Sequence, residues 1–366
     1  SDPDALRSYI NDKYINDGIS YVIIGADDDV IPAKDLYVKT SDDFGAEIEY
    51  EMPGDLYFVC LDGTWNYDND SYWGEPTDGD GGGDVDLIAE LSIGRAAVDN
   101  STEATRFVDK TIQYVNSTDS YLQNVLMVGE HLGFGGEAEY GALAMDRNID
   151  SCDAYGYSTI GIPSNQYSVD RLYERDWVGN SWPQSELTSR INNGVHIVNH
   201  LGHGSPDYAM KLYNSDIYND LTNLKHCFVY SQTCLAGHFD GTECWAETMN
   251  IKTDNGGFAV VMNARYGFGE YSSTDGASQR FNREFWDAVY NPLENKKRIG
   301  DANRDSKEDN LYRVNEECMR WCYYEINLFG DPTVEIRSAR GVSFEFPNGL
   351  PETVLPETPT TISVMV

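Results

Sequence analysis

Short apolar runs separated by amphipathic stretches constrain the fold of this chain more than any other feature. The runs lie at residues 21–25, 55–61, 124–129, 194–200, 227–234 and 256–263. Runs of this length between turn-forming residues are typical of buried strands. Residues 102–115, 277–290 and about 304–326 instead carry apolar side chains at three- and four-residue spacing, which predicts helices. The alternation predicts an α/β sandwich with a mostly parallel sheet, in which functional residues gather at the carboxyl ends of strands.

The composition divides the chain into three parts. Its 366 residues are enough for two or three folding units. A polar stretch ends the first helical pattern at 116–120, so we expect one α/β unit over residues 1–120 and a second over 121–340. Residues 341–366 are proline-rich and end in a β-prone stretch, which predicts a linker and the first strand of a truncated all-β module. The start, SDPDAL, has neither Met nor an apolar leader and indicates a processed chain.

The charge balance narrows the kinds of partner. Lys and Arg number 26 against 61 Asp and Glu, which gives a formal charge of −35. We do not expect nucleic acid as a partner, because a surface this acidic repels phosphate backbones. The same charge keeps the protein solvated and favours cationic substrates or bound Ca²⁺. No run of 18 apolar residues is present, so we expect no membrane-spanning helix.

Two successive strand ends carry the residues of greatest chemical interest. The run HIVNHLGHGSPD places His203 and Gly204 where an apolar strand stops, and CFVYSQTC ends in Cys234. An imidazole beside a thiol stabilises the thiolate, which is the attacking species, and the backbone amides of Gly204 and Cys234 are placed to donate to an oxyanion. A buried Cys or a strand-end His alone is an ordinary core feature. Their pairing, in a chain whose seven cysteines lack framework spacing, predicts a catalytic Cys-His dyad.

Three histidines raise an alternative chemistry. His196, His200 and His203 have the spacing of a zinc-binding helix, which would make the chain a zinc-dependent hydrolase. No Glu follows His196 to activate water, and the surrounding β-branched residues favour a strand, on which His196 and His200 share a face while His203 lies beyond the end. A third alternative is a non-catalytic adhesion or binding module on the same fold.

Several segments resemble the gingipain family of caspase-like cysteine peptidases. They are YVIIGADDDVIP, DLYFVCLDGTWNYDNDSYWGE, LSIGRAAVDNSTEATRFVDKTIQYV, NVLMVGEHLG, VNHLGHGS, the Cys234 loop with CWAETM behind it, GGFAVVMNARYGFG and NLFGDPTVEI, and they run from about Tyr21 to Ile336. The resemblance implies a caspase-hemoglobinase-like α/β/α sandwich in two subdomains. It also implies a following immunoglobulin-like domain, whose start resembles residues 341–366, and a secreted or cell-surface endopeptidase that acts on proteins or peptides.

The resemblance also implies roles for individual residues. By motif, Cys234 is the nucleophile, His203 the base, and Glu130 in VGEHLG the carboxylate that orients His203 and stabilises its cation. Gingipains are similar in preferring a basic residue before the scissile bond, so we expect cleavage after Arg or Lys.

The pocket for that basic side chain is expected in the loop after Glu130. In gingipains an acidic residue of this loop lies at the pocket base, and here the candidates are Glu137, Glu139 and Asp146. Arg265 and Tyr266, in NARYGFG, fall where the opposite wall is expected. Arg265 either pairs with such a carboxylate or disfavours a cationic side chain.

An acidic loop suggests a structural Ca²⁺ ion, which the family's calcium dependence also implies. Hard oxygen ligands crowd the stretch WNYDNDSYWGEPTDGDGGGDVD, and the candidates for binding the ion are Asp68, Asp70, Glu75, Asp84 and Asp86. DANRDSKED at 301–309 imitates the start of an EF-hand loop, but Arg304 and Tyr312 occupy positions that require Gly and Glu. We expect a helix to begin there instead.

Overall fold

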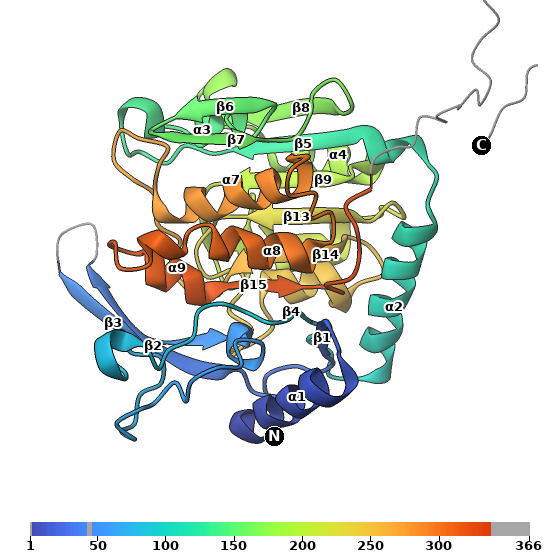
Figure 1. Cartoon of the computed structure of the whole chain (residues 1–366). Coiled ribbons are helices and arrows are strands. Elements are labelled where there is room, and N and C mark those ends of the chain that lie inside the picture. The colour runs from blue at the N-terminus through green and yellow to red at the C-terminus, as the bar shows by residue number, and fades with distance from the viewer. Residues whose placement is uncertain (1, 42–45, 338–366) are drawn as a thin grey trace, which may run out of the picture.

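The computed structural model describes residues 2–41 and 46–337, and its centre is one eight-stranded sheet (Figure 1). The strand order is β1-β4-β15-β14-β13-β9-β5-β8. The bounds are β1 Tyr21–Ile24, β4 Ser92–Arg95, β5 Asn124–Gly129, β8 Ser168–Tyr173, β9 Ile197–Leu201, β13 Cys227–Ser231, β14 Gly257–Asn263 and β15 Ile326–Phe329. Strands β14 to β8 are all parallel, whereas β15 is antiparallel to β14 and parallel to β4. The predicted mainly parallel α/β sheet is therefore confirmed.

Helices pack on both faces of the sheet and make it the middle of three layers. Alternate residues of β5 point to opposite faces, with Val125 and Met127 in one apolar cluster and Leu126 and Val128 in the other. The first cluster includes side chains of α7 (Ala277–Tyr290), α8 (Ile299–Glu308) and α9 (Met319–Glu325). The second includes side chains of α2 (Ser101–Asn116), α4 (Gln184–Gly194) and α5 (Asn214–Asp220). Continuous apolar runs form the central strands because both faces are covered.

Shorter elements surround this core. They are α1 Pro3–Asp17, α3 Ala142–Asp146, α6 Trp245–Glu247, the hairpin β2 Lys34–Ser41 with β3 Glu47–Gly54, the hairpin β6 Ser151–Ala154 with β7 Tyr157–Ile160, and a small sheet of β10 Gly204–Ser205, β11 Tyr208–Ala209 and β12 Leu212–Tyr213. The small sheet follows β9 directly, so it begins at the carboxyl edge of the main sheet.

Two of the predicted elements were wrong in detail. Residues 55–61 do not form a strand: Asp55–Phe58 is a 3-10 helix whose four residues are all buried, and Asp55 forms an ion pair with buried Arg95. Full burial makes a short helix and a strand equally apolar, so the run could not tell them apart. The helix expected at 304–326 is broken into α8, the 3-10 turn Leu311–Arg313 and α9, with Cys318 at a left-handed φ of 63° before α9. The expected helix over DANRDSKED is confirmed as part of α8.

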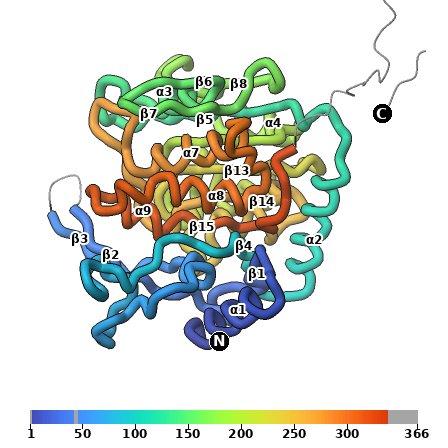
Figure 2. The backbone as a smooth tube through the Cα atoms, in the orientation of Figure 1, coloured from blue at the N-terminus to red at the C-terminus, as the bar shows by residue number. Residues whose placement is uncertain are grey.

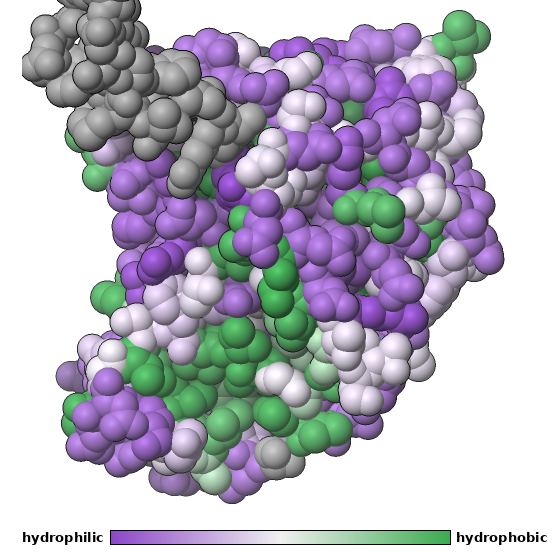
Figure 3. Space-filling view, turned by 90° about the vertical axis from the view of Figure 1, so that its right-hand side faces the viewer, coloured by the Kyte–Doolittle hydropathy of each residue, from purple (hydrophilic) through white to green (hydrophobic). Residues whose placement is uncertain are grey.

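Helix α2 connects the two ends of the sheet. Figure 2 shows it running along one side, from β1 and β4 towards β5. Figure 3 looks onto this side of the molecule, and apolar residues gather in the lower part of that view. On α2, the side chains of Val108, Ile112 and Val115 are about half exposed. Within the described residues, no helix has both the length and the apolar character needed to span a bilayer. The expected immunoglobulin-like start at 341–366 lies outside the described residues.

Candidate active site

The register of two parallel strands brings His203 and Cys234 to the same edge of the sheet. Strand β9 pairs with β13 so that His200 lies opposite Ser231. His203 and Cys234 each follow three residues beyond that pair. Their segments also touch, because a Cβ added to Gly204 would lie 2.9 Å from the Cys234 carbonyl oxygen and 2.4 Å from Thr233 Oγ1. Glycine at 204 is what allows this close approach.

The ring of His203 is held by one backbone carbonyl. Its Nε2 lies 2.9 Å from the carbonyl oxygen of His131. A carbonyl only accepts hydrogen bonds, so Nε2 carries the proton in both the neutral and the cationic imidazole. Nδ1 is then the nitrogen that takes up and releases a proton. The side chain of His203 is exposed, as a base that meets substrate must be.

Glu130 supports His203 through the main chain. It follows β5, which neighbours β9, and its Oε2 accepts the backbone N–H of His203 at 2.9 Å. Its Oε1 lies 3.5 Å from Nε2 of buried His200. Burial acts to raise the pKa of Glu130, but the His200 imidazole and the His203 N–H outweigh it and bring the pKa below its ordinary value. The carboxylate is therefore ionised at neutral pH beside the His203 backbone.

Cys234 is a partly exposed thiol at this edge. Its Sγ donates to the Gly267 carbonyl at 3.7 Å, and the next residue, Leu235, donates its N–H to the Arg265 carbonyl at 2.6 Å. The segment after β14 thus fixes the loop that carries the thiol. No disulfide joins any of the seven cysteines, and Cys60, Cys227, Cys244 and Cys322 are buried, as expected for core residues. Burial raises the pKa of the Cys227 thiol to about 12.

The three carboxylates proposed for the substrate pocket have different partners. Glu137 forms an ion pair with Arg147 at 3.0 Å. Asp146 pairs with Arg171 at 2.8 Å and with Arg175 at 3.1 Å. Glu139 contacts Nε2 of His131 at 3.0 Å and accepts the Gly135 N–H at 3.0 Å. Among these three carboxylates, only Glu139 lacks an Arg or Lys partner.

Arg265 pairs with a carboxylate that sequence patterns did not single out. Its guanidinium forms a two-pronged ion pair with Asp240 at 2.8 and 2.6 Å, and its backbone N–H donates to Glu325 at 3.0 Å. Arg265 is buried, so its charge is already neutralised inside the protein. The neighbouring Tyr266 is partly exposed, and its carbonyl accepts from Trp321 Nε1 at 2.9 Å. Asp240 lies in the loop after Cys234, which carries no pattern that would have identified it.

Two hollows lie near the dyad. A cleft of about 540 Å³ is lined by Glu130, His131, His203 and the ion pair of Glu174 with Lys211. A cavity of about 330 Å³ has Phe134, Phe268, Tyr271, Glu270, Asp275 and Arg280 among its lining residues. Phe268 follows Gly267, whose carbonyl accepts from Cys234, so this cavity is the hollow nearer in the chain to the segment that holds the thiol.

The histidines proposed as zinc ligands do not converge. His196 lies at the start of β9, where its Nδ1 contacts the Leu122 carbonyl at 2.8 Å and its Nε2 the Tyr114 hydroxyl at 2.8 Å. His200 bonds Ser231 Oγ at 2.7 Å through Nδ1. Four residues of strand place His196 and His200 about 13 Å apart. Among the described residues, no group of possible metal ligands includes these histidines.

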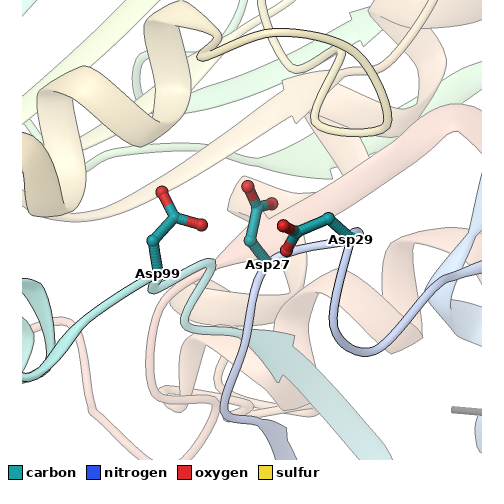
Figure 4. Close-up of side chains that lie close together, drawn as sticks. All are labelled: Asp27, Asp29 and Asp99. Carbon is teal, nitrogen blue, oxygen red and sulfur yellow. The ribbon is translucent and has the colours of Figure 1, made fainter.

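Carboxylates do come together in several places. Asp68, Asp70 and Glu75 have oxygen atoms within 4.8 Å of one another, as the calcium expectation requires. Of the other two candidates, Asp86 groups with Asp62 and Glu90, and Asp84 bonds Thr64. Two further groups are Glu294, Asp305 and Asp309, and Asp27, Asp29 and Asp99. Figure 4 shows the last group, with its carboxylates turned towards one another from the loops after β1 and β4.

Comparisons with known proteins agree on the family. The model of peptidase family C25 matches residues 1–337. The crystal structure of the Arg specific cysteine proteinase gingipain R shares 18% identity, with a TM-score of 0.66 over 92% of this chain and 69% of that chain. A complex of the pro- and mature domains of RgpB from Porphyromonas gingivalis gives 17% identity and a TM-score of 0.65 over 92% and 70%. No curated protein sequence matches significantly.

These solved structures share less than 20% sequence identity with the chain, so they show its fold. The family match covers all of the described residues. The fold, the strand-end residues and the family model point the same way. The chain belongs to peptidase family C25, the gingipain family, and is a cysteine-type endopeptidase.

Proposed function

We propose that this protein cleaves peptide bonds with Cys234 as nucleophile and His203 as general base and acid. The observation that carries the proposal is the equal offset of both residues from the paired His200 and Ser231 on adjacent parallel strands. Because the base and the thiol follow rigid strands, their relative position depends little on loop motion. Glu130 assists by holding the backbone of His203.

The proton path follows from the tautomer of His203. Since Nε2–H is bonded to the His131 carbonyl, Nδ1 accepts the thiol proton of Cys234. The thiolate attacks the scissile carbonyl, and the imidazolium gives its proton to the leaving amine. Water then attacks the acyl enzyme while His203 accepts a proton from it, the C–S bond breaks to release the acid, and the imidazolium returns its proton to the Cys234 sulfur. The cationic intermediate keeps its bond to His131, so the ring need not turn between the two half-reactions.

Oxyanion stabilisation is assigned to the backbone amides of Gly204 and Cys234. The contact between the two segments, with Gly204 lacking a Cβ, supports placing both amides near one developing charge. A side chain at 204 would push the segments apart. Gly204→Ala is therefore expected to lower kcat more than it raises KM, because the oxyanion exists only after attack.

The two hollows suggest how a substrate lies. His203 must protonate the leaving amine, so the cleft on its side receives the leaving part of the chain. The cavity nearer the segment that holds Cys234, with Phe134 and Phe268 in its lining, then receives the side chain before the scissile bond. We propose that this side chain is Arg or Lys and that Glu139, which bonds the Gly135 N–H next to Phe134, attracts it. Glu139 is favoured over Glu137 and Asp146 because, among the described residues, no Arg or Lys pairs with it.

Peptide-library profiling tests the specificity. Glu139→Gln is expected to raise KM for substrates with Arg or Lys before the cleaved bond, and Glu137→Gln, in the same loop, serves as its matched control. An unchanged preference in Glu139→Gln would assign the basic pocket elsewhere, with Glu270 in the cavity lining the next carboxylate to replace.

We further propose that Asp68, Asp70 and Glu75 bind a structural Ca²⁺ ion and that the protein acts outside the cell or on its surface. Oxygen ligands in this close grouping suit Ca²⁺. Burial and the neighbouring Asp70, Asp78 and Asp68 raise the pKa of Glu75, which a bound cation would reverse. The localisation rests on the secreted members of the family.

One experiment tests the central proposal. Cys234→Ala should abolish peptide hydrolysis while leaving the unfolding temperature unchanged, and iodoacetamide should label the wild-type thiol with a matching loss of activity. Cys152→Ala, which removes another partly exposed thiol, is the control. Hydrolysis that survives in Cys234→Ala would exclude the dyad, and a folded wild-type protein without hydrolysis would favour a binding module.

A further inference from the structure

Glu174 occupies a place equivalent to that of Glu130 on the next strand. Strand β8 pairs with β5 so that Tyr173 lies opposite Gly129, and Glu174 and Glu130 are the residues that follow. Both carboxylates are therefore at the sheet edge that carries the dyad. Glu174 is 7% exposed, and its Oε2 accepts the backbone N–H of His131 at 2.6 Å. His131 is the residue whose carbonyl holds His203 Nε2.

Lys211 holds Glu174 from the other side. Its Nζ forms an ion pair with Glu174 Oε1 and donates to Ser181 Oγ at 2.7 Å and to the Trp182 carbonyl at 2.9 Å. The Trp182 ring centroid lies 4.3 Å from Nζ, which adds a cation–π contact. The three donors of the ammonium group are thus all directed to fixed partners.

The backbone at Lys211 is itself unusual. Lys211 and Met210 form the two-residue turn between β11 and β12, with left-handed φ values of 59° and 53°. Residues other than glycine and asparagine avoid this region because of their Cβ. The turn nevertheless carries Lys, in the position that brings its ammonium group to Glu174. Backbone strain of this kind collects at functional sites, where the side chain it presents is needed.

We propose that Glu174 is a positioning residue for the base His203 and that Lys211 fixes Glu174 in place. The chain of contacts runs from Lys211 to Glu174, to the N–H of His131, and from the carbonyl of His131 to His203 Nε2. His131 also pairs with Tyr140 and contacts Glu139 through its ring, but Glu174 is the side chain that holds its backbone N–H. The inference rests on the proposed function, in which Nδ1 of His203 must face Cys234 as a base.

Kinetics distinguish this role from a merely structural one. Glu174→Ala should lower kcat by about tenfold to a hundredfold, because a displacement of about 1 Å of a catalytic group has an effect of that size, while KM stays within about twofold. Glu174→Gln should fall between, since its amide oxygen can still accept from His131 but cannot pair with Lys211. Asp170→Asn, which removes the exposed ion pair with Arg190 from the same strand, should keep wild-type kcat.

Lys211→Gly separates positioning from stability. Glycine suits a φ of 59°, so this variant should unfold at a higher temperature than Lys211→Ala, which loses the same ion pair with Glu174. Its kcat should fall as in Glu174→Gln, because the ion pair is lost. A folded Lys211→Gly or Glu174→Ala protein with wild-type kcat would overturn the proposal.

A readout without substrate keeps the inference separate from the proposed function. In ¹⁵N-histidine NMR spectra of the wild type, neutral His203 should be the Nε2–H tautomer, and Glu174→Ala should give mixed tautomers. If hydrolysis survives Cys234→Ala, the proposed function fails, and this spectrum still decides whether Glu174 positions His203. Unchanged His203 resonances in Glu174→Ala would refute the positioning role.

Discussion

Gly202 is the position at which a single methyl group would test the packing behind the dyad. It lies between β9 and His203, and a Cβ there would stand 2.4 Å from Glu130 Oε2, 2.5 Å from Glu130 Cδ and 2.5 Å from His200 Nε2. Ordinary contacts begin near 3.4 Å, so the carboxylate must retreat by about 1 Å in Gly202→Ala. The backbone of Gly202 is not left-handed, so the loss of stability in Gly202→Ala comes from the contacts with Glu130 and His200 and not from backbone strain.

The magnitude has two parts. Displacing the carboxylate breaks its hydrogen bond with the His203 N–H, and a hydrogen bond to a charged group contributes about 1.5–3 kcal/mol. Overpacking of a rigid site adds about 1–3 kcal/mol. We therefore expect Gly202→Ala to lower the free energy of unfolding by about 2.5–6 kcal/mol in urea titrations. The folded fraction should also lose about a hundredfold in kcat/KM, because the backbone of His203 moves with Glu130.

Matched variants decide whether this reasoning holds. Gly25 also follows a parallel strand, but its Cβ would meet nothing within 4 Å, so Gly25→Ala should leave stability unchanged or raise it by up to about 1 kcal/mol. In a Glu130→Ala background the clash with the carboxylate is gone and only the contact with His200 Nε2 remains, so Gly202→Ala should cost at least about 1 kcal/mol less than in the wild type. Equal costs in both backgrounds, or a Gly202→Ala protein with wild-type stability, would refute the argument.

Three further outcomes follow from the charges. The pKa of Glu130 is lowered in the folded state, so its ionised form stabilises the protein above its ordinary pKa of 4.5. This contribution is lost as the pH falls through the folded-state pKa. The difference in stability between the wild type and Glu130→Gln should therefore shrink in urea titrations below pH 4.5. Arg265→Ala removes the Arg partner of Asp240 and should lower the free energy of unfolding by about 3–5 kcal/mol. In thermal unfolding, the double variant Arg265→Ala with Asp240→Ala should recover part of that loss. No loss in Arg265→Ala would show that the ion pair is dispensable. Added Ca²⁺ should raise the unfolding temperature of the wild type but not of Asp70→Asn, and equal shifts would place the ion elsewhere.

The residues of the dyad could be predicted because the strands that carry them are central. β5, β9, β13 and β14 are covered on both faces and all their residues except Asn124 are buried, so each is a mostly apolar run. In the edge strand β8, SVDRLY, only the last two residues are buried and the middle two are charged, so its pattern is weak. Glu174 was missed for this reason, although it follows β8 as Glu130 follows β5.

The contacts that complete the site were beyond sequence patterns because they join distant segments. His131 and Glu174 are 43 residues apart, and Arg265 and Asp240 are 25 apart. A local pattern of charge predicts partners three or four residues away on a helix, not partners that meet through sheet order. From the sequence, one possibility for Arg265 was an ion pair with a carboxylate in the loop after Glu130. The structure instead pairs Arg265 with Asp240, in the loop that follows Cys234.

Sheet order also makes the positions of His203 and Cys234 independent of the segment that connects β9 to β13. Neighbouring strands lie about 4.8 Å apart, and equal offsets from a registered pair keep His203 and Cys234 level with each other whatever the intervening residues do. Contacts with Glu130, His131 and Gly267 then fix how the side chains of His203 and Cys234 leave the ends of their strands. A one-residue insertion between Ser231 and Cys234 should therefore inactivate the protein, since it shifts the thiol by about 3.3 Å along the strand direction. A one-residue insertion beside Leu224, which is exposed and precedes β13, should leave activity intact because the register of β13 against β9 is unchanged.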